Sequence, residues 1–328
     1  MNKIYLSRTT ISIIILIFAF GCKFKASTPA DTIPHSSQTK WKQTSLKING
    51  SDWQDVPALA VNGTSIYAGT YEKGVYVSTD NGANWKNIKN GFKNYTINAL
   101  AISGKTIFAG TDKGLYLLTP NGENWKICLN GIPEIQISSL LVNGKNIYAG
   151  TNNGLYLSTN NGNSWLPLKK GLENKWIKSL AVNGKFLFAG TQYNGIYIST
   201  DYGISWKKAD SRFPECTVNS IAFCENTVLA GTVKGLYLST DNGNSWKKSA
   251  VEIPEDIEIA IAVNGENIYI GSTGNGAFFS NNKGNSWNSF NEGFSTETSE
   301  LIKSIESLVI MGNNIYAGTK NGIWVRAL

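Results

Sequence analysis

Histidine is almost absent from this sequence: the only imidazole is His35, close to the N-terminus. Ser-His-Asp and Cys-His catalytic sites and histidine-based zinc sites all depend on imidazole, so none of them can form in the long segment after His35. The sequence also lacks a P-loop, a nucleotide-binding Gly-x-Gly-x-x-Gly that opens a helix, and the Cys-x-x-Cys-His of haem attachment. These absences predict no cofactor, no metal ion and no recognisable catalytic residue.

Arginine and cysteine are also scarce. The formal net charge is +7, but nearly all of the positive charge is lysine spread along the chain, and no basic cluster predicts a nucleic-acid partner. Cys216 and Cys224 stand at the two ends of one predicted strand, which separates them far beyond the reach of a disulfide. We therefore expect these two cysteines and Cys128 to be free.

The first 21 residues have the pattern of a secretion signal. Lys3 and Arg8 precede an apolar run over residues 11–20, which is too short to span a bilayer stably. The run ends in Ala-Phe-Gly-Cys, and this small residue directly before Cys22 resembles the lipobox of bacterial lipoproteins. The resemblance implies cleavage before Cys22 and lipidation of its thiol. An ordinary cleaved signal and a retained transmembrane anchor stay open as alternatives.

Residues 22–37 contain two prolines and several serines and threonines, which predict a flexible tether. Acyl chains on Cys22 would each contribute about 0.8 kcal/mol per buried CH₂ and would hold the protein on a membrane. We therefore expect an exported protein that is lipid-anchored to a bacterial membrane, the outer membrane if the organism has one.

A Gly-Thr or Gly-Ser pair recurs at intervals of 40 or 41 residues, with a last interval of 47. Each interval has the same order: an apolar strand, a turn, a strand ending in the pair, a short loop, a third strand, a turn, and a fourth strand that opens with Trp. Four strands repeating at about 40 residues are typical of a β-propeller blade. The seven glycines are Gly69, Gly110, Gly150, Gly190, Gly231, Gly271 and Gly318.

The third repeat shows the predicted blade. Its strands are expected at Ile137–Val142, Asn146–Thr151, Leu155–Thr159 and Trp165–Leu168. Asn-Gly between two apolar runs is a strong hairpin signal, because a type I′ turn needs positive φ at both central residues. This dipeptide begins at Asn62, Asn143, Asn183 and Asn264.

A second motif marks the turn between the third and fourth strands, as in Ser78–Trp85, with looser copies at Thr119–Trp125 and Ser280–Trp287. Its Asp is expected to bond to backbone amides of the turn, its Gly to take an unusual φ, and its Trp to pack between neighbouring sheets. The acidic position recurs so regularly that it predicts a structural role. It holds Asp80, Asp201 and Asp241, with Asn160 and Asn281 expected as substitutes.

The seventh repeat ends with its third strand at Trp324–Leu328. The segment Trp41–Ser45 is similar to the fourth strands that begin at Trp206 and Trp246. We expect this N-terminal strand to complete the last blade and close the ring, which removes exposed strand edges. The sequence thus predicts an all-β fold: one seven-bladed β-propeller of four-stranded antiparallel blades over residues 38–328.

From about Trp41 to Leu328 the chain resembles the Asp-box (BNR) propellers, a group with bacterial sialidases, xyloglucan-cleaving glycosidases, sortilin-type receptors and photosystem II stability factors. This resemblance implies the fold and not one activity, because the fold carries many unrelated sites. Sialidases of the group hold the substrate carboxylate with three arginines. This chain has only Arg212 and Arg326 after the signal, so sialidase activity is not expected.

Two functions remain. A glycosidase needs two carboxylates about 5 to 10 Å apart in unlike environments. Carboxylates do occur in the loops between predicted blades, but none is singled out as a pair. We therefore expect a monomeric, non-enzymatic binding or scaffold module for an envelope protein or glycan, with a glycoside hydrolase as the alternative. The loop carboxylates are Glu134, Glu173, Glu215, Glu255 and Asp256.

The binding surface is expected on one face of the ring. Strands alternate in direction, so the first and third turns of every blade share one face, here called the Asp-box face. The second-to-third strand loops and the inter-blade loops share the other, here called the variable face because its residues differ between blades. Trp176 stands outside the Trp position of the repeat; it is expected either to bind ligand or to cover the channel mouth. The candidate binding residues are Tyr71, Tyr95, Trp176, Tyr193 and Arg212.

Overall fold

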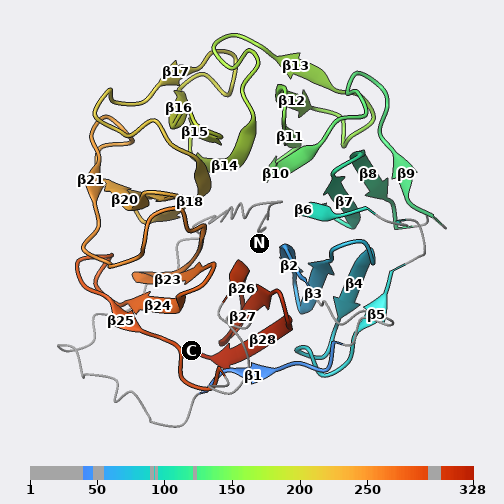
Figure 1. Cartoon of the computed structure of the whole chain (residues 1–328). Coiled ribbons are helices and arrows are strands. Elements are labelled where there is room, and N and C mark those ends of the chain that lie inside the picture. Colours follow the sequence, from blue (N-terminus) through green and yellow to red (C-terminus); the bar gives the residue numbers. More distant parts are fainter. Residues whose placement is uncertain (1–39, 47–54, 89–91, 93–94, 121–123, 295–303) are drawn as a thin grey trace, which may run out of the picture.

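The computed structural model describes residues 40–46, 55–88, 92, 95–120, 124–294 and 304–328. These residues form seven four-stranded antiparallel sheets arranged as blades around a central axis (Figure 1), which confirms the predicted fold. The described part of the chain contains no helix long and apolar enough to cross a bilayer. Four predicted features lie outside the described residues: the signal over 1–21, the lipidation site Cys22, the tether over 22–37, and the segment 295–303, an insertion that accounts for the last interval of 47 residues.

Each blade runs outward from the axis through four strands, and blades 1 to 7 follow the chain. The innermost strands are β2 (Ala58–Asn62), β6 (Ile97–Ser103), β10 (Ile137–Asn143), β14 (Ile177–Asn183), β18 (Val218–Cys224), β22 (Ile259–Asn264) and β26 (Ile305–Met311). The second strands are β3 (Ser65–Gly69), β7 (Thr106–Thr111), β11 (Asn146–Thr151), β15 (Phe186–Thr191), β19 (Thr227–Thr232), β23 (Asn267–Ser272) and β27 (Asn314–Thr319).

The two outer strands of each blade are shorter. The third strands are β4 (Val75–Ser78), β8 (Gly114–Leu118), β12 (Gly154–Ser158), β16 (Ile196–Ser199), β20 (Gly235–Ser239), β24 (Gly276–Ser280) and β28 (Gly322–Ala327). The outermost strands are β5 (Lys86–Asn87), β9 (Lys126–Ile127), β13 (Leu166–Leu168), β17 (Lys207–Lys208), β21 (Lys247–Lys248), β25 (Asn288–Ser289) and β1 (Lys42–Gln43).

The recurring Gly-Thr pair is required by contact between blades. A Cβ added at Gly110 would lie 2.6 Å from Ile137 Cγ2 in the next blade, and one at Gly69 would lie 2.5 Å from Ile97 Cγ2. Only glycine therefore lets the second strand meet the next innermost strand. The Thr closes the following loop, as where Thr111 Oγ1 donates to Gly114 O at 2.9 Å. The strongest repeat signal in the sequence is thus a packing constraint.

The innermost strands are also tied to one another by serine hydroxyls. Ser179 Oγ donates to Val218 O at 2.9 Å in the next blade. Ser307 Oγ donates to Val56 O at 3.0 Å and so links blade 7 to blade 1. These bonds satisfy buried backbone carbonyls where strands of different sheets meet.

The N-terminal strand closes the ring as predicted. β1 pairs antiparallel with β28, with Lys42 opposite Val325 and Gln43 opposite Trp324. Trp41 is buried, its Nε1 donates to Phe290 O at 2.6 Å, and its ring stacks on Phe294 at 4.8 Å. Residues from the two ends of the chain therefore share one blade.

The predicted type I′ turns are wrong. Asn62 and its equivalents are the last residues of the innermost strands, so the two-residue loop is Gly63-Thr64 and Asn62 pairs with Ser65. Gly63 has φ +60 and Thr64 has no positive φ, which is the type II′ combination. The strand ladder continues through the Asn, so the Gly alone takes the left-handed conformation.

The Asp-box turns of blades 1, 3, 4, 5 and 6 agree with the prediction except at one position, and residues 121–123 of the looser copy in blade 2 lie outside the described residues. Asp201 Oδ1 accepts from Ser205 N at 2.9 Å and from Ser199 Oγ at 2.7 Å, and Trp206 Nε1 donates to Gly203 O at 3.1 Å. In blade 6 Asn282 makes the bonds of the acidic residue, and the expected Asn281 does not. The predicted residue is one position too early in this turn, because two asparagines are adjacent.

The three cysteines of the propeller are free and buried, as predicted. Burial raises the pKa of the Cys128 thiol to about 12 and that of Cys224 to about 11. The thiols therefore pack as small apolar groups rather than reacting.

Candidate functional site

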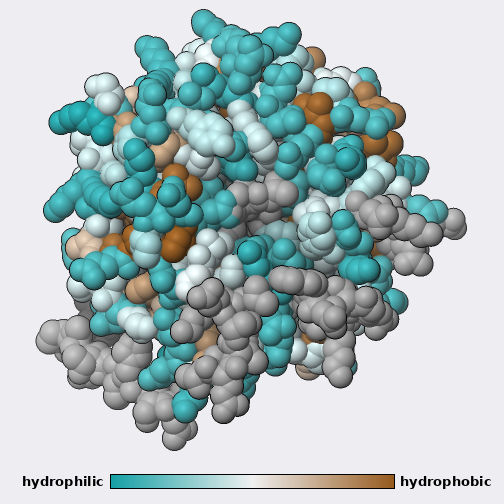
Figure 2. Space-filling model, viewed as in Figure 1, coloured by the Kyte–Doolittle hydropathy of each residue, from teal (hydrophilic) through white to brown (hydrophobic). Residues whose placement is uncertain are grey.

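Hydrogen bonds confirm that the second-to-third strand loops and the inter-blade loops share the variable face. Asn152 N donates to Gln136 O at 3.2 Å, and Gln192 N donates to Trp176 O at 2.9 Å. These are backbone bonds, so the loop side chains are free to differ between blades. Figure 2 shows one end of the ring along the axis, where the described surface is mostly hydrophilic with separate hydrophobic groups.

Two of the predicted binding residues are exposed. Tyr71 is 50% exposed in the loop after β3, and Tyr193 is 68% exposed in the loop after β15. Tyr193 has φ +71 and Glu72, beside Tyr71, has φ +58. A side chain in this region costs about 1 kcal/mol, so both tips hold an unfavourable backbone to present their side chains. The neighbouring Glu72 carboxylate raises the pKa of Tyr71, which keeps the phenol neutral.

Trp176 is held in place on both sides. It is half-buried directly before β14, and its Nε1 donates to Ser138 Oγ at 2.7 Å in blade 3. Lys178 Nζ lies 4.5 Å from the centre of its ring, within cation–π range. The indole therefore bridges two blades where their innermost strands begin and also leaves part of its surface open.

A set of polar residues next to Trp176 was missed by sequence reasoning. Five innermost strands carry a β-bulge immediately after their first residue, and the extra residue in each is polar. Both side-chain polar atoms of Asn219 and the Oδ1 of Asn98 are buried without a hydrogen-bond partner. Buried unpaired amides are rare, so this position is a candidate place for a polar ligand or a water molecule. The bulge residues are Asn98, Ser138, Lys178, Asn219 and Glu306.

A sequence signal for this set does exist. Each polar residue directly follows the Ile or Val that opens the innermost strand, and in every strand but β6 a serine comes next. The hydrophobic pattern alone cannot show that the strand bulges there, so the residue reads as one ordinary step of the strand.

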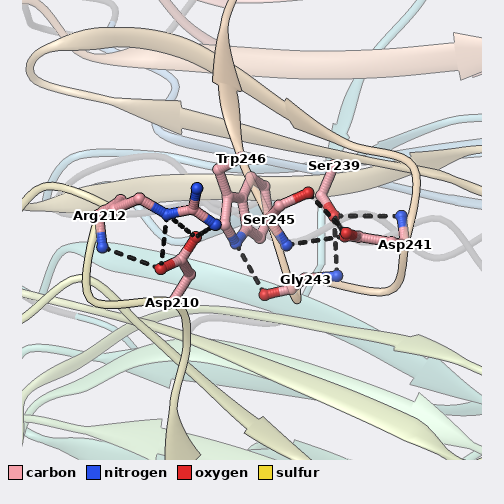
Figure 3. A network of polar contacts seen from close by, with 7 residues as sticks. All are labelled: Asp210, Arg212, Ser239, Asp241, Gly243, Ser245 and Trp246. Carbon is pink, nitrogen blue, oxygen red and sulfur yellow. Dashed lines mark hydrogen bonds and ion pairs between the residues drawn. The ribbon is translucent and has the colours of Figure 1, made fainter.

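The other two predicted binding residues, Tyr95 and Arg212, contact neighbouring side chains. Tyr95 is half-buried and its ring lies 6.0 Å from that of Tyr116, so it packs between blades. Arg212 forms an ion pair with Asp210, with Nη2 to Oδ2 at 2.7 Å. Figure 3 shows this pair beside the Asp box of blade 5, next to Trp246 and Ser245.

The second arginine of the propeller is structural. Arg326 is buried, its guanidinium lies 3.8 Å from the centre of the Phe290 ring, and its Nη1 donates to Phe290 O at 3.2 Å. Arg326 and Arg212, which is ion-paired with Asp210, are the two arginines of the described residues.

Two of the loop carboxylates are paired with lysines. Glu215 is ion-paired with Lys208, which lowers the pKa of its carboxyl, and Glu255 lies 3.7 Å from Lys248. A general acid needs a raised pKa, so Glu215 has the opposite tuning. The two lysines lie in the outermost strands of different blades, Lys208 in β17 and Lys248 in β21.

Three hollows in the described surface each contain at most one carboxylate. One of about 330 Å³ is lined by Glu173, together with Tyr156 and Pro167, and contains no second carboxylate. A second, of about 380 Å³, contains Asp210 alone, and a third, of about 510 Å³, contains none. No group of His, Cys, Asp and Glu in the described residues could hold a metal ion.

The fold and its turns define a class: a single seven-bladed propeller with Asp-box turns. Residues 197–208, which include the Asp box of blade 4, match the family model of the BNR/Asp-box repeat. No curated protein sequence matches the chain.

Solved structures share the fold at low identity. The extracellular domain of a putative hybrid two-component system from B. thetaiotaomicron has a TM-score of 0.72 and 18% identity over 88% of this chain and 39% of that one. A GH74 xyloglucanase from Xanthomonas campestris has 0.67 and 14% over 88% and 53%. YCF48 bound to a D1 peptide has 0.66 and 12% over 88% and 96%. The chain thus spans about two fifths of the first of these proteins.

Proposed function

We propose that this protein is an exported, non-enzymatic binding or scaffold module for a protein or glycan of the cell envelope. The observation that carries the proposal is the state of the carboxylates: each described hollow contains at most one, and Glu215 and Glu255 are paired with lysines. A glycosidase needs two carboxylates across one cleft. A surface of exposed rings and unpaired amides suits recognition instead.

The binding surface is the variable face around the axis. Tyr71 and Tyr193 supply exposed rings, and Trp176 with Lys178 supplies a ring and a charge beside the unpaired amide of Asn219. This mixture of rings and hydrogen-bonding groups is suited to a peptide segment or a sugar. YCF48, which has the same fold, has been solved with a peptide bound, and this supports a protein ligand.

Export and anchoring through Cys22 are part of the proposal. The similarity to extracellular domains supports export, and the lipobox-like sequence supports lipidation. The mass of the mature N-terminal peptide is the measurement: acyl chains are expected on Cys22. An unmodified N-terminus would contradict the anchor without affecting the binding proposal.

Affinity capture from envelope membranes tests binding, with the anchored chain as bait. The double variant Trp176→Ala/Tyr193→Ala is expected to lose the captured ligand and to remain folded by circular dichroism. The matched control is Asn163→Ala/Asn244→Ala, which alters two exposed Asp-box turns and should keep it. Capture lost only in the control would put the site on the Asp-box face.

A screen against aryl glycosides and polysaccharides tests the alternative, which the xyloglucanase similarity keeps in view. No turnover is expected. Turnover that disappears in Glu173→Gln or Glu215→Gln would overturn the proposal in favour of a glycoside hydrolase.

A further inference from the structure

Blade 4 departs from the repeat on the Asp-box face. In its Asp box, Tyr202 and Ile204 stand where blade 3 has Asn161 and Asn163, and they are 59% and 69% exposed. Blade 5 has two asparagines at these places as well. Tyr202 also takes φ +59, which is less favourable for Tyr than for Asn. Blade 4 therefore keeps an exposed apolar turn at a conformational cost.

Two more apolar side chains lie at the same end of the strands. Leu166 opens β13 and is 65% exposed, whereas β5, β9, β17 and β21 all open with Lys. Phe186 opens β15, where every other second strand opens with Ser, Thr or Asn. Phe186 shares a hollow with Thr200 and Ser205 of the Asp box, so it lies beside the turn that carries Tyr202 and Ile204.

Three exposed lysines lie at the same end of blades 3 and 4 as these apolar side chains. Lys145 and Lys185 are exposed in the first turns of blades 3 and 4, and Lys207 is exposed directly after the Asp box of blade 4. No carboxylate in the described residues pairs with them, and Asp201 accepts its hydrogen bonds within its own turn. Lys283 in the Asp box of blade 6 differs from these three lysines because carboxylates pair with it.

Lys283 is neutralised by its neighbours. Its Nζ lies 2.8 Å from Glu225 Oε2 and 3.0 Å from Glu266 Oε1. The first turns of blades 5 and 6 therefore carry carboxylates that pair with Lys283, whereas the first turns of blades 3 and 4 carry Lys145 and Lys185.

The chain also enters the ring from this face. β28 runs from the variable face to the Asp-box face, and β1 is antiparallel to it, with Gln43 Nε2 donating to Asn321 O on the variable side. Trp41 therefore approaches from the Asp-box side. The described chain therefore begins at the face that carries the lysines and the apolar turn.

We propose that the Asp-box face of blades 3 and 4 docks on an anionic phospholipid bilayer, with Ile204, Tyr202 and Leu166 entering the headgroup region. Apolar side chains on the tip of a turn, flanked by lysines, suit insertion among headgroups. Each lysine near an anionic surface strengthens the association about fivefold. The variable face then points away from the membrane towards its ligand. Only the orientation by the tether rests on the proposed anchor.

Spin-label depth measurement tests this on the full chain in vesicles of phosphatidylethanolamine and phosphatidylglycerol. A nitroxide introduced through Ile204→Cys is expected to be open to oxygen and shielded from a water-soluble nickel complex. The control label, Asn153→Cys on the variable face, should be open to nickel. The three cysteines of the propeller are buried and will not take up the label.

Replacing phosphatidylglycerol by phosphatidylcholine, or Lys145, Lys185 and Lys207 by Gln, should return the label at residue 204 to water. Equal nickel access at 204 and 153 in anionic vesicles would overturn the proposal. So would a 204 label shielded from both reagents without any vesicles, which indicates a protein contact. If the label at residue 204 lies within the bilayer while Cys22 is unmodified, docking is supported and the lipid anchor is contradicted. Failure of the docking proposal and failure of the anchor can therefore be told apart.

Discussion

The turns of the Asp-box face and the loops of the variable face are both short connections, but they satisfy their polar groups differently. In an Asp box the side chain of Asp201 bonds to Ser199 and Ser205 of the same turn. In a variable loop the backbone bonds to the next inter-blade loop, as Gln192 does to Trp176. A turn that stabilises itself through side chains restricts its own sequence. A loop that is held by its backbone leaves its side chains free for binding.

The largest expected effect tests whether the closing strand is equivalent to an Asp-box strand. Trp165 and Trp41 are both buried at the start of an outermost strand, and each Nε1 donates to a backbone carbonyl. Each change to Ala should lower the free energy of unfolding by roughly 3–5 kcal/mol. Tyr193→Ala, on an exposed variable loop, should stay within about 0.5 kcal/mol. Urea unfolding is the measurement, and a mild Trp41→Ala would mean that β1 contributes little to closing the ring.

Much of the fold could be predicted from the sequence because its constraints recur in every blade. The Gly-Thr pair, the Asp box and the similarity of Trp41 to Trp206 indicated seven blades and their closure. The type II′ turns were missed because the same Asn-Gly letters fit two registers. Asn281 was chosen over Asn282 for a similar reason, since periodicity does not fix a position to one residue.

The candidate site was predictable only in part. Exposure at loop tips could be inferred for Tyr71 and Tyr193, since such residues have no place in the repeat. The packing of Tyr95 against Tyr116 and the pairing of Arg212 with Asp210 depend on the exact path of an inter-blade loop. The unpaired amide of Asn219 depends on a bulge. Neither the path of the loop nor the bulge is indicated by a repeating pattern in the sequence.

A smaller effect separates acidic from neutral Asp boxes by pH. Hydrogen bonds from the side chain and backbone of Ser205 lower the pKa of Asp201 to about 2, below its unfolded value of about 4. The contribution to stability is therefore complete above about pH 4 and is lost as the pH falls towards about 2. Asp201→Asn should flatten the unfolding free energy over this window. The reciprocal change, Asn160→Asp in blade 3, should steepen it, and curves that do not change would contradict the assignment.

The smallest effect concerns the first turn of blade 5. Glu225 has φ +52 at the position where blades 1 to 4 carry a glycine, such as Gly184 with φ +58. Glu225→Gly should relieve about 1 kcal/mol of backbone strain. It should also lose the exposed ion pair with Lys283, which contributes well under about 1 kcal/mol. Glu225→Gln measures the ion pair alone, because it keeps the backbone strain. Gly184→Glu, which meets no atom within 4 Å of the added Cβ, should cost about 1 kcal/mol. A net loss of stability in Glu225→Gly that matches Glu225→Gln would show that this turn is held by charge and not strained by its φ.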